Sequence, residues 1–194
     1  MAHKFNVANK NKLDNEWRRE NIPPKDVLKE FGLLETDNFA DIGCGIGYFS
    51  IAAADIIDVN NKIFAMDISD DMLVEVEKRA QVADVSNIVT VKTNEYDLKL
   101  PDASVSFALV VNVLHEVDDK DKFVKEIKRI LKNDARVALM EWDKIEMDMG
   151  PPVDHRISSE ELQNLFLENG FNHDSSSTYA NIFYGETFIN TINI

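Results

Sequence analysis

The chain has 194 residues, of which 44% are hydrophobic and 29% charged, with a formal net charge of −14 and a pI near 4.6. A chain of this length buries a sizeable core without disulfides or metals, so we expect one domain spanning residues 1–194. The negative charge argues against a nucleic-acid partner, because phosphate backbones require a basic surface. The single cysteine, Cys44, excludes an internal disulfide framework and fits a reducing compartment.

Two further absences bear on localisation. No apolar run approaches the roughly 18 residues that a membrane span requires. Residues 1–12 also lack the apolar core of a signal peptide. We therefore expect a cytoplasmic protein without a membrane span, either a monomer or a homodimer.

Residues 1–37 precede the main pattern and are expected to form an N-terminal helical lid. Their first part is polar, with isolated apolar residues such as Leu13 and Trp17. Pro23 and Pro24 favour the start of a helix, because proline suits a first helical turn, and the pattern predicts a helix over residues 25 to about 35. We expect this lid to pack on a cofactor-binding core at residues 38–194.

From residue 38 onward, short apolar runs alternate with segments of helical periodicity. The runs predict strands at residues 39–42, 62–68, 88–92, 105–113 and 136–142. The intervening periodicity predicts helices at residues 46–57, from 70 onward, and at 120–132. This alternation, with a fourth strand apolar throughout, predicts an α/β fold with a Rossmann-like, doubly wound, mostly parallel sheet.

The C-terminal part breaks the alternation. Residues 158–169 read as a helix that Ser158 or Ser159 caps and Gly170 ends. Two strand-like segments follow at residues 175–181 and 183–192, close enough to pair antiparallel. We therefore expect seven strands, the last two forming an antiparallel hairpin.

The most informative stretch follows the first strand and reads Asp41-Ile42-Gly43-Cys44-Gly45-Ile46-Gly47. Three of the seven glycines of the chain lie within these positions. Glycines after a strand allow positive φ and let a ligand approach the main chain, and the next helix begins with unpaired N–H donors. The stretch predicts a cofactor of nucleotide type.

The glycine spacing argues against a dinucleotide. A dinucleotide fingerprint reads G-x-G-x-x-G, and its third glycine would fall at Tyr48. A tyrosine there disfavours NAD or FAD, so an NAD-dependent oxidoreductase is the less favoured reading. Asp67 ends the second strand and is expected to bind ribose hydroxyls with either kind of cofactor.

At this point the chain resembles the class I S-adenosylmethionine-dependent methyltransferases. Asp41 to Gly47 resembles their first motif, and Ala65-Met66-Asp67-Ile68-Ser69 their second. Leu98 to Ser104 is similar to the segment before their fourth strand, and Asn112 to Val117 to the end of that strand. Within the family, the chain resembles the small-molecule branch, including quinone methyltransferases and uncharacterised type 11 methyltransferases.

The resemblance implies S-adenosyl-L-methionine as cofactor, S-adenosyl-L-homocysteine as product and a small-molecule methyl acceptor. It places the cofactor site at Asp41, Gly43, Cys44, Gly45, Gly47, Asp67, Ile68, Met72, Asn94, Glu95 and Asn112. Asp41 would receive the cofactor's amino group, Asp67 the ribose diol, and Ile68 would pack on the adenine. Asn94 and Glu95 would read the adenine edge, while Asn112 would hold the methionine end.

The catalytic chemistry depends on the acceptor atom. Alignment of donor and acceptor supplies much of the rate of a methyl transfer, and an oxygen or carbon acceptor also requires a base. Candidate bases beyond strand ends are His115, Glu116, Glu141 and Asp143, and His115 is preferred because its ordinary pKa is near 6.5. The sequence identifies neither the acceptor nor the need for a base, and a non-catalytic S-adenosylmethionine-binding protein is the alternative.

Other residues carry weaker signals. Aromatic side chains are candidates for an apolar acceptor pocket, namely Phe5, Trp17, Tyr48 and Trp142. His155 and His173 are spaced unlike metal ligands, so we expect no metal site. Cys44 is interpreted as a small residue that fits the glycine loop.

Overall fold

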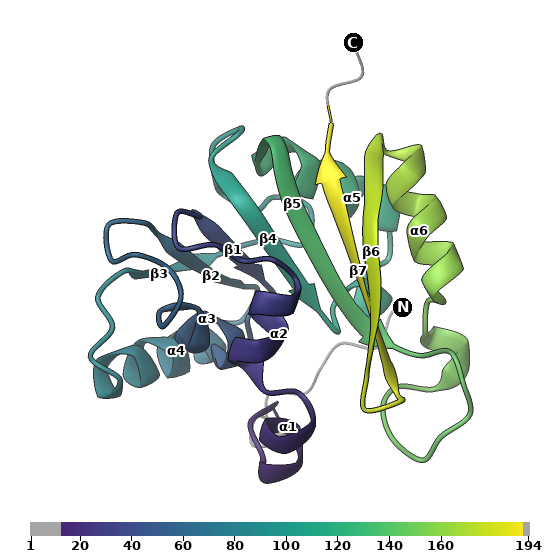
Figure 1. The fold of residues 1–194 in the computed structure, drawn as a ribbon, viewed down its shortest axis with the longest axis horizontal. Coiled ribbons are helices and arrows are strands. Elements are labelled where there is room, and N and C mark those ends of the chain that lie inside the picture. Colours follow the sequence, from purple (N-terminus) through teal and green to yellow (C-terminus); the bar gives the residue numbers. More distant parts are fainter. Residues whose placement is uncertain (1–12, 192–194) are drawn as a thin grey trace.

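A seven-stranded sheet organises the molecule (Figure 1). The computed structural model describes residues 13–191. The strands are β1 (Phe39–Ile42), β2 (Ile63–Asp67), β3 (Ile88–Lys92), β4 (Val105–Val111), β5 (Leu131–Trp142), β6 (Phe171–Tyr179) and β7 (Phe183–Asn190). They lie in the order β3-β2-β1-β4-β5-β7-β6, and β7 runs antiparallel to both of its neighbours. The predicted mostly parallel seven-stranded sheet with a C-terminal antiparallel hairpin is confirmed.

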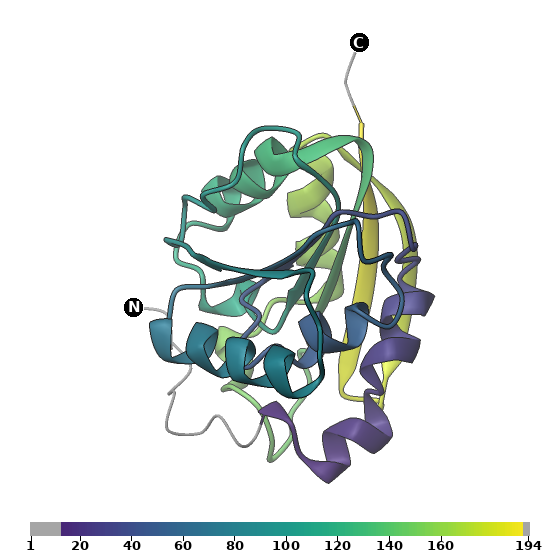
Figure 2. The same cartoon turned by 90° about the vertical axis from the view of Figure 1, so that its left-hand side faces the viewer.

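Helices cover both faces of this sheet (Figure 2). They are α1 (Glu16–Asn21), α2 (Pro24–Glu30), α3 (Tyr48–Ala53), α4 (Asp70–Val82), α5 (Lys120–Ile130) and α6 (Ser159–Glu168). α2, α3 and α4 pack on one face, and α5 and α6 pack on the other. Within residues 13–191, no helix has the length and apolar character needed to cross a membrane.

The two central strands explain why the sheet is covered twice. Successive side chains of a strand point to opposite faces. In β1, Phe39 packs with α2 and α3, whereas Ala40 and Ile42 pack toward α5 and α6. β4 repeats the pattern, with Phe107 on the first side and Ala108 on the second. The near-continuous apolar runs in the sequence reflect this burial on both sides.

Several boundaries differ from the predicted ones. α3 is shorter than the predicted 46–57, because Gly47 adopts a positive φ of 78° and the helix begins only at Tyr48. α2 ends at Glu30 rather than near residue 35, and Gly32 follows with a φ of 84°. α6 agrees closely with its prediction, and Ser158 and Glu161 form a reciprocal capping box at its start.

The largest errors concern β5 and β6. β5 begins at Leu131 rather than at residue 136, directly after α5. β6 begins at Phe171 rather than at residue 175, and most of its side chains are exposed and polar. β6 is an edge strand, where polar side chains are common, so its sequence lacks the apolar alternation of a central strand.

Candidate functional site

A cavity of about 1440 Å³ opens beyond the carboxyl ends of β1 and β4. The strand order reverses between these two strands, which is where open α/β sheets bind ligands. Its volume exceeds the roughly 300–1,000 Å³ of an ordinary ligand pocket. The cavity therefore has room for a cofactor and a second molecule.

The structure brings together nearly all of the predicted cofactor-site residues. Those that line the cavity are Asp41, Gly43, Cys44, Gly45, Asp67, Ile68, Met72, Asn94, Glu95 and Asn112. Gly47 is not among the lining residues. A Cβ atom at Gly47 would lie 3.1 Å from a methyl group of Val76 on α4, so this glycine serves the close approach of α3 and α4.

The glycine loop is held by hydrogen bonds within the protein. The amides of Gly43 and Cys44 donate to the carbonyl of Met66 at 2.8 and 2.9 Å, and the amide of Gly45 donates to Asp67 at 2.9 Å. These three donors are therefore not available to a pyrophosphate group. This arrangement agrees with the argument from Tyr48 against a dinucleotide.

Asp41 is a buried carboxyl at the end of β1. Burial raises its pKa to about 7, although the Ser50 hydroxyl donates to Oδ2 at 2.5 Å and opposes that rise. A carboxyl whose ionisation is this unfavourable is stabilised by a positive group placed next to it. Asp41 is thus suited to an ammonium group in the cavity.

Asp67 both shapes the loop and faces the cavity. Its Oδ2 accepts the amide of Gly45, and its Oδ1 accepts the amide of Ser69 at 2.8 Å. Burial raises its pKa, and these two hydrogen bonds partly oppose the rise. Each carboxylate oxygen accepts more than one hydrogen bond, so both retain capacity for a diol.

The predicted adenine side consists of Ile68, Met72, Asn94 and Glu95. Ile68 is 48% exposed, whereas Met72 is buried. Asn94 is exposed and forms a two-way backbone bridge with Asp97. Glu95 accepts hydrogen bonds from the Tyr96 hydroxyl and the Asp118 amide, which fix its side chain beside the cavity.

Asn112 ends β4 in an unusual state. Its backbone adopts a φ of 55°, a left-handed conformation that asparagine tolerates better than most residues. Its side-chain oxygen is shielded from solvent and accepts no hydrogen bond from residues 13–191. Because a buried acceptor without a partner is costly, this oxygen indicates a ligand that donates a hydrogen bond.

His115 and Glu141 were predicted as separate candidate bases, and the structure joins them. Nδ1 of His115 lies 2.7 Å from Oε2 of Glu141, which is 1% exposed. Burial lowers the pKa of His115, but the hydrogen bond and charge of Glu141 outweigh it, and the net shift is upward. His115 lines the cavity, whereas Glu141 and Asp143 do not.

The side of the cavity away from the adenine residues is aromatic. Trp142 and Phe183 stand 4.3 Å apart between ring centroids, and both line the cavity with Trp17 and Tyr48. Phe5, the other aromatic candidate, lies outside the described residues. The loop after β5 completes this wall through Asp148, Met149, Gly150, Pro151 and Pro152.

Two arginines of this region had no predicted role. Arg156 is buried, and its guanidinium donates to the backbone carbonyls of Asp143, Ile145, Met149 and Pro151. Arg18 lines the cavity from α1. The sequence offers no local signal for either role, because both depend on how distant segments meet.

The Cys44 thiol is not suited to nucleophilic chemistry here. Burial raises the pKa of the Cys44 thiol well above its ordinary value, which keeps it neutral and unreactive. Within residues 13–191, no group of three or more His, Cys, Asp or Glu side chains is placed to hold a metal ion.

Comparisons with known proteins agree with this geometry. Residues 40–139 match a family model described as a methyltransferase domain. A demethylmenaquinone methyltransferase from Listeria welshimeri is 26% identical over 130 residues, covering 67% of this chain and 52% of the relative. A ubiquinone/menaquinone biosynthesis C-methyltransferase UbiE from Pasteurella multocida is 29% identical over 133 residues, covering 68% of this chain and 47% of the relative. The chain thus spans about half the length of the curated relatives it matches.

A solved structure extends the similarity to nearly the whole chain. The crystal structure of a SAM-dependent methyltransferase from Aquifex aeolicus is 28% identical, with a TM-score of 0.91, and the match covers 97% of this chain and 100% of that one. The family model alone spans more than half of the residues. The chain therefore belongs to the methyltransferase-domain family, with the class I S-adenosylmethionine-dependent architecture that its motifs indicated.

Proposed function

We propose that this protein is an S-adenosylmethionine-dependent methyltransferase that transfers a methyl group to a small-molecule acceptor. One observation carries the proposal: the Asp67 carboxylate and the unpartnered side-chain oxygen of Asn112 line the same cavity beside the glycine loop. The first suits a ribose diol and the second an amino-acid ammonium group. A ligand that carries both groups, and no pyrophosphate, is S-adenosylmethionine.

The residues present fit this cofactor along its length. Ile68 and Met72 offer apolar surface for the adenine, Asp67 hydrogen-bond acceptors for the ribose, and Asp41 with Asn112 acceptors for the ammonium group. When bound, S-adenosylmethionine supplies an electrophilic methyl group on a sulfonium. The protein contributes by holding an acceptor in line with that methyl group, a positioning effect that reaches about 7–11 kcal/mol in ideal cases.

The aromatic part of the cavity suits the acceptor. Trp142 and Phe183 offer apolar surface, and His115 offers a titratable nitrogen at the same opening. With Nδ1–H donated to Glu141, the neutral ring of His115 has its lone pair on Nε2. His115 is therefore our proposed base for an acceptor that must lose a proton, with Glu141 orienting it.

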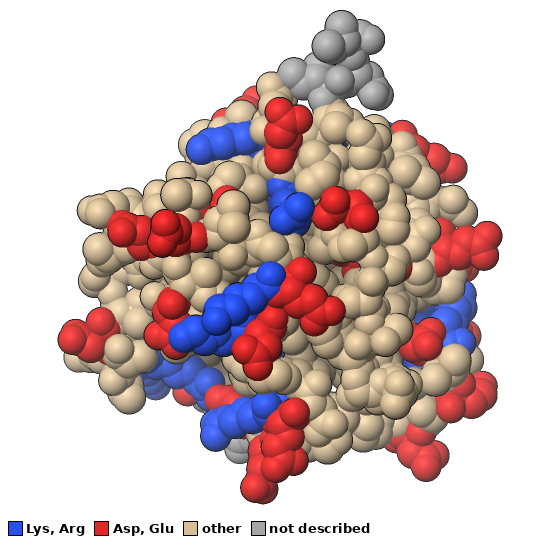
Figure 3. Space-filling model, viewed as in Figure 1, with Lys and Arg blue, Asp and Glu red and all other residues tan. Residues whose placement is uncertain are grey.

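The similar proteins and the surface charge both bear on the class of methyl acceptor. One relative is named a demethylmenaquinone methyltransferase and another a ubiquinone/menaquinone biosynthesis C-methyltransferase, so a soluble 1,4-naphthoquinol belongs in any acceptor panel. On the face shown in Figure 3, lysine and arginine side chains lie among acidic ones. The described residues include such ion pairs, for example Lys25 with Asp55 and Arg136 with Asp174. This charge pattern supports a small molecule over a nucleic acid.

We further propose a cytoplasmic protein, because its one cysteine fits a reducing compartment.

Calorimetric titration tests the cofactor assignment. We expect S-adenosylmethionine and S-adenosylhomocysteine to bind, and NAD to give no heat. Tight NAD binding without a response to the sulfonium cofactor would overturn the proposal. A second candidate function, a non-catalytic S-adenosylmethionine-binding protein, is separated by release of S-adenosylhomocysteine over a panel of phenols, quinols, amines and thiols, since a fold by itself does not establish a reaction.

A further inference from the structure

Hydrogen bonds and side-chain packing hold the N-terminal helix α1 beside the glycine loop. The hydroxyl of Tyr48, the first residue of α3, donates to the carbonyls of Arg18 at 3.2 Å and Ile22 at 2.8 Å. Leu13 lies against the loop itself, because a Cβ atom at Gly45 would come within 3.0 Å of its Cδ1. α1 therefore belongs to the same side of the cavity as the glycine loop.

The guanidinium of Arg18 lies at the cavity over an aromatic ring, and its Nε has no hydrogen-bond partner in the described part of the chain. Its Cζ stands 4.9 Å from the centroid of the Tyr48 ring. Its Nε is shielded from solvent and donates no hydrogen bond, and its side chain forms no ion pair within the described part of the chain. Arg18 is thus a positive charge at the cavity, and its Nε donor has no acceptor among residues 13–191.

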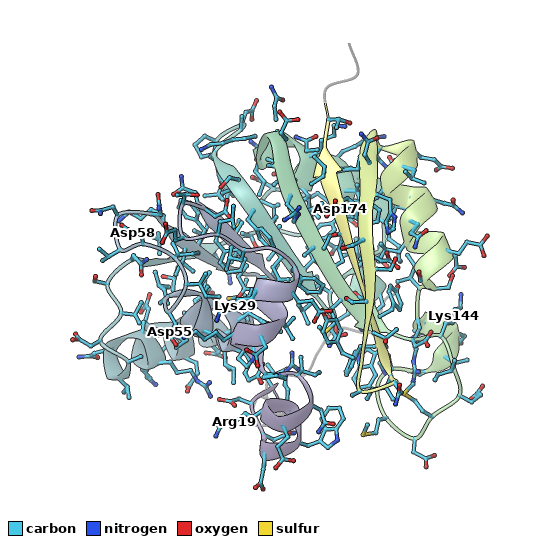
Figure 4. The ribbon with its side chains drawn as sticks, in the orientation of Figure 1. Arg19, Lys29, Asp55, Asp58, Lys144 and Asp174 are labelled. Atoms are coloured by element: carbon cyan, nitrogen blue, oxygen red, sulfur yellow. The ribbon has the colours of Figure 1, made fainter. Side chains whose placement is uncertain are left out.

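The neighbouring Arg19 shows what an ordinary arginine on this helix does. Its side chain is exposed and pairs with Asp14 at 2.6 Å, and Figure 4 labels it at α1. Lys92, another basic residue of the lining, pairs with Asp70 at 2.7 Å. Arg18 differs from both, since it stacks on aromatic rings and forms no ion pair with a carboxylate among residues 13–191.

An unpaired, shielded charge is costly, and the cost falls when an anion binds. Burial lowers the pKa of Arg18, while the negative charges of Asp14 and Asp41 oppose that effect. Asp41 and Arg18 therefore lie close enough to interact electrostatically. Within residues 13–191, the shielded side-chain atoms without a partner are Arg18 Nε, Asn112 Oδ1, Arg136 Nε and Asn190 Oδ1, and the first two belong to residues that line this cavity.

These two atoms are complementary to the two ends of an α-amino acid. Asn112 offers an acceptor for an ammonium group, and Arg18 offers a charged donor for a carboxylate. We propose that Arg18 binds the α-carboxylate of the methionine part of S-adenosylmethionine, so that α1 is a wall of the cofactor site. This assignment rests on the proposed function. It gives the N-terminal lid, which was expected to pack on the cofactor-binding core, a role in binding the methyl donor.

Paired changes in protein and ligand test the assignment. The affinity of S-adenosylhomocysteine and of its decarboxylated analogue, which keeps the ammonium group, is measured by calorimetry on the wild type and on Arg18→Met. We expect Arg18→Met to weaken S-adenosylhomocysteine binding by about 10- to 100-fold, the usual effect of losing a charged hydrogen bond. Removing the carboxylate should cost as much in the wild type and almost nothing further in Arg18→Met.

Arg19→Met is the matched control, because it removes an exposed cation of the same helix that does not line the cavity. Its S-adenosylhomocysteine affinity should stay within twofold of the wild type. Arg18→Lys keeps the charge but loses the planar fork, so an intermediate affinity is expected, and this variant serves if Arg18→Met fails to fold. Circular dichroism of each variant reports folding.

Three outcomes would overturn the assignment. Unchanged S-adenosylhomocysteine affinity in Arg18→Met would mean that the guanidinium does not bind the carboxylate of the cofactor. Additive losses from the two changes would mean that the cofactor carboxylate is held elsewhere. Failure of the wild type to bind S-adenosylhomocysteine would overturn the proposed function as well, which separates the two failures.

Discussion

His115 and Glu141 form a buried pair in which one carboxylate holds two groups. Oε2 of Glu141 lies 2.7 Å from Nδ1 of His115, while Oε1 accepts the amide of Leu114 at 2.8 Å. The residues come from the short 3₁₀ turn after β4 and from β5, two neighbouring strands of the sheet. The carboxylate therefore fixes both the position of the turn and the tautomer of the ring.

Glu141→Gln is expected to lower the pKa of His115. In the wild type the Glu141 charge stabilises the imidazolium and raises that pKa, whereas burial, which remains in the variant, lowers it. Losing a charged hydrogen bond corresponds to about 1–2 pKa units. NMR titration of the His115 ring measures the change. Glu116→Gln is the control, because Glu116 stands 3.8 Å from Nε2 and should have a smaller effect; an equal effect of both variants would contradict the pairing.

His115→Gln is expected to reduce turnover with acceptors that must lose a proton. General-base catalysis contributes about 10²- to 10⁴-fold, and the wild-type rate should rise with pH above 6.5 as the imidazole, whose pKa is raised, becomes neutral. The variant should lose that rising limb while keeping its affinity for S-adenosylhomocysteine. Release of S-adenosylhomocysteine across pH provides the measurement. An unchanged pH profile would remove His115 from the catalytic role and leave it as a structural partner of Glu141.

Asp67→Ala is expected to weaken S-adenosylhomocysteine binding by about 1.5–3 kcal/mol, because charged hydrogen bonds to the ribose are lost. The variant should also be less stable, since Asp67 accepts the amides of Gly45 and Ser69. Asp67→Asn keeps one carbonyl acceptor and should lie between the two. Calorimetry and thermal unfolding separate the effects, with Asp55→Asn as a surface control. A loss of stability without a loss of affinity would limit Asp67 to holding the loop.

The cofactor side of the site was predictable because its signals are local. Gly43, Gly45 and Tyr48 lie within six residues of one another, and their spacing argues against a dinucleotide cofactor. In the structure, the amides of this loop already donate hydrogen bonds to other protein groups. The near-continuous apolar run of β4 likewise predicts a strand covered on both faces. Gly47 shows the limit of this reasoning, since its positive φ serves the packing of α3 against Val76.

The rest of the site depends on contacts between distant segments. His115 and Glu141 are 26 residues apart, and Tyr48 and the Arg18 carbonyl are 30 apart. A periodic pattern in the sequence does not indicate contacts between residues this far apart. His115 and Glu141 were therefore predicted as alternative bases and not as one hydrogen-bonded pair. The start of β6 was predicted too late for a related reason. Phe171–Tyr179 is an exposed edge strand, so most of its side chains are polar, and its pairing with β7 determines where it begins and ends.

Arg156→Lys is expected to loosen the loop that walls the acceptor side of the cavity. The guanidinium of Arg156 donates to four backbone carbonyls, at 2.7–2.9 Å, whereas a lysine has three donors and no planar fork. We expect a loss of roughly 1–3 kcal/mol in stability and faster amide exchange confined to residues 143–152. Hydrogen exchange by mass spectrometry gives the measurement.

Arg129→Lys is the matched comparison for that loop experiment. Arg129 pairs with Glu126 and Asp102 beside α5, away from the loop. Its replacement should lower stability without changing exchange in residues 143–152. Uniform acceleration across the molecule in Arg156→Lys would show that this arginine serves global stability alone.

Asp41→Asn is expected to make the protein more stable at pH 8 and less able to bind S-adenosylhomocysteine. Burial raises the pKa of Asp41 to about 7 from its ordinary 3.8, so the folded state favours the protonated carboxyl. At pH values between 3.8 and about 7, the folded state binds more protons than the unfolded state, so the stability of the wild type falls as the pH rises through this range. A neutral asparagine lacks this dependence. The variant's advantage should therefore reach on the order of 4 kcal/mol above pH 7 and vanish near pH 4.

Cofactor binding should depend on the ionisation of the same Asp41 carboxyl, but the affinity should rise with pH where the stability falls. The ammonium group of S-adenosylhomocysteine favours the ionised carboxyl, so the wild-type affinity should increase as pH rises through 7, and Asp41→Asn should not show this increase. Urea unfolding at pH 5 and pH 8 and calorimetry at the same two values measure both effects. If the wild type and Asp41→Asn lost stability equally between pH 5 and pH 8, the buried carboxyl would not be the titrating group. If they also gained affinity equally, the ammonium group would be held by Asn112 without Asp41.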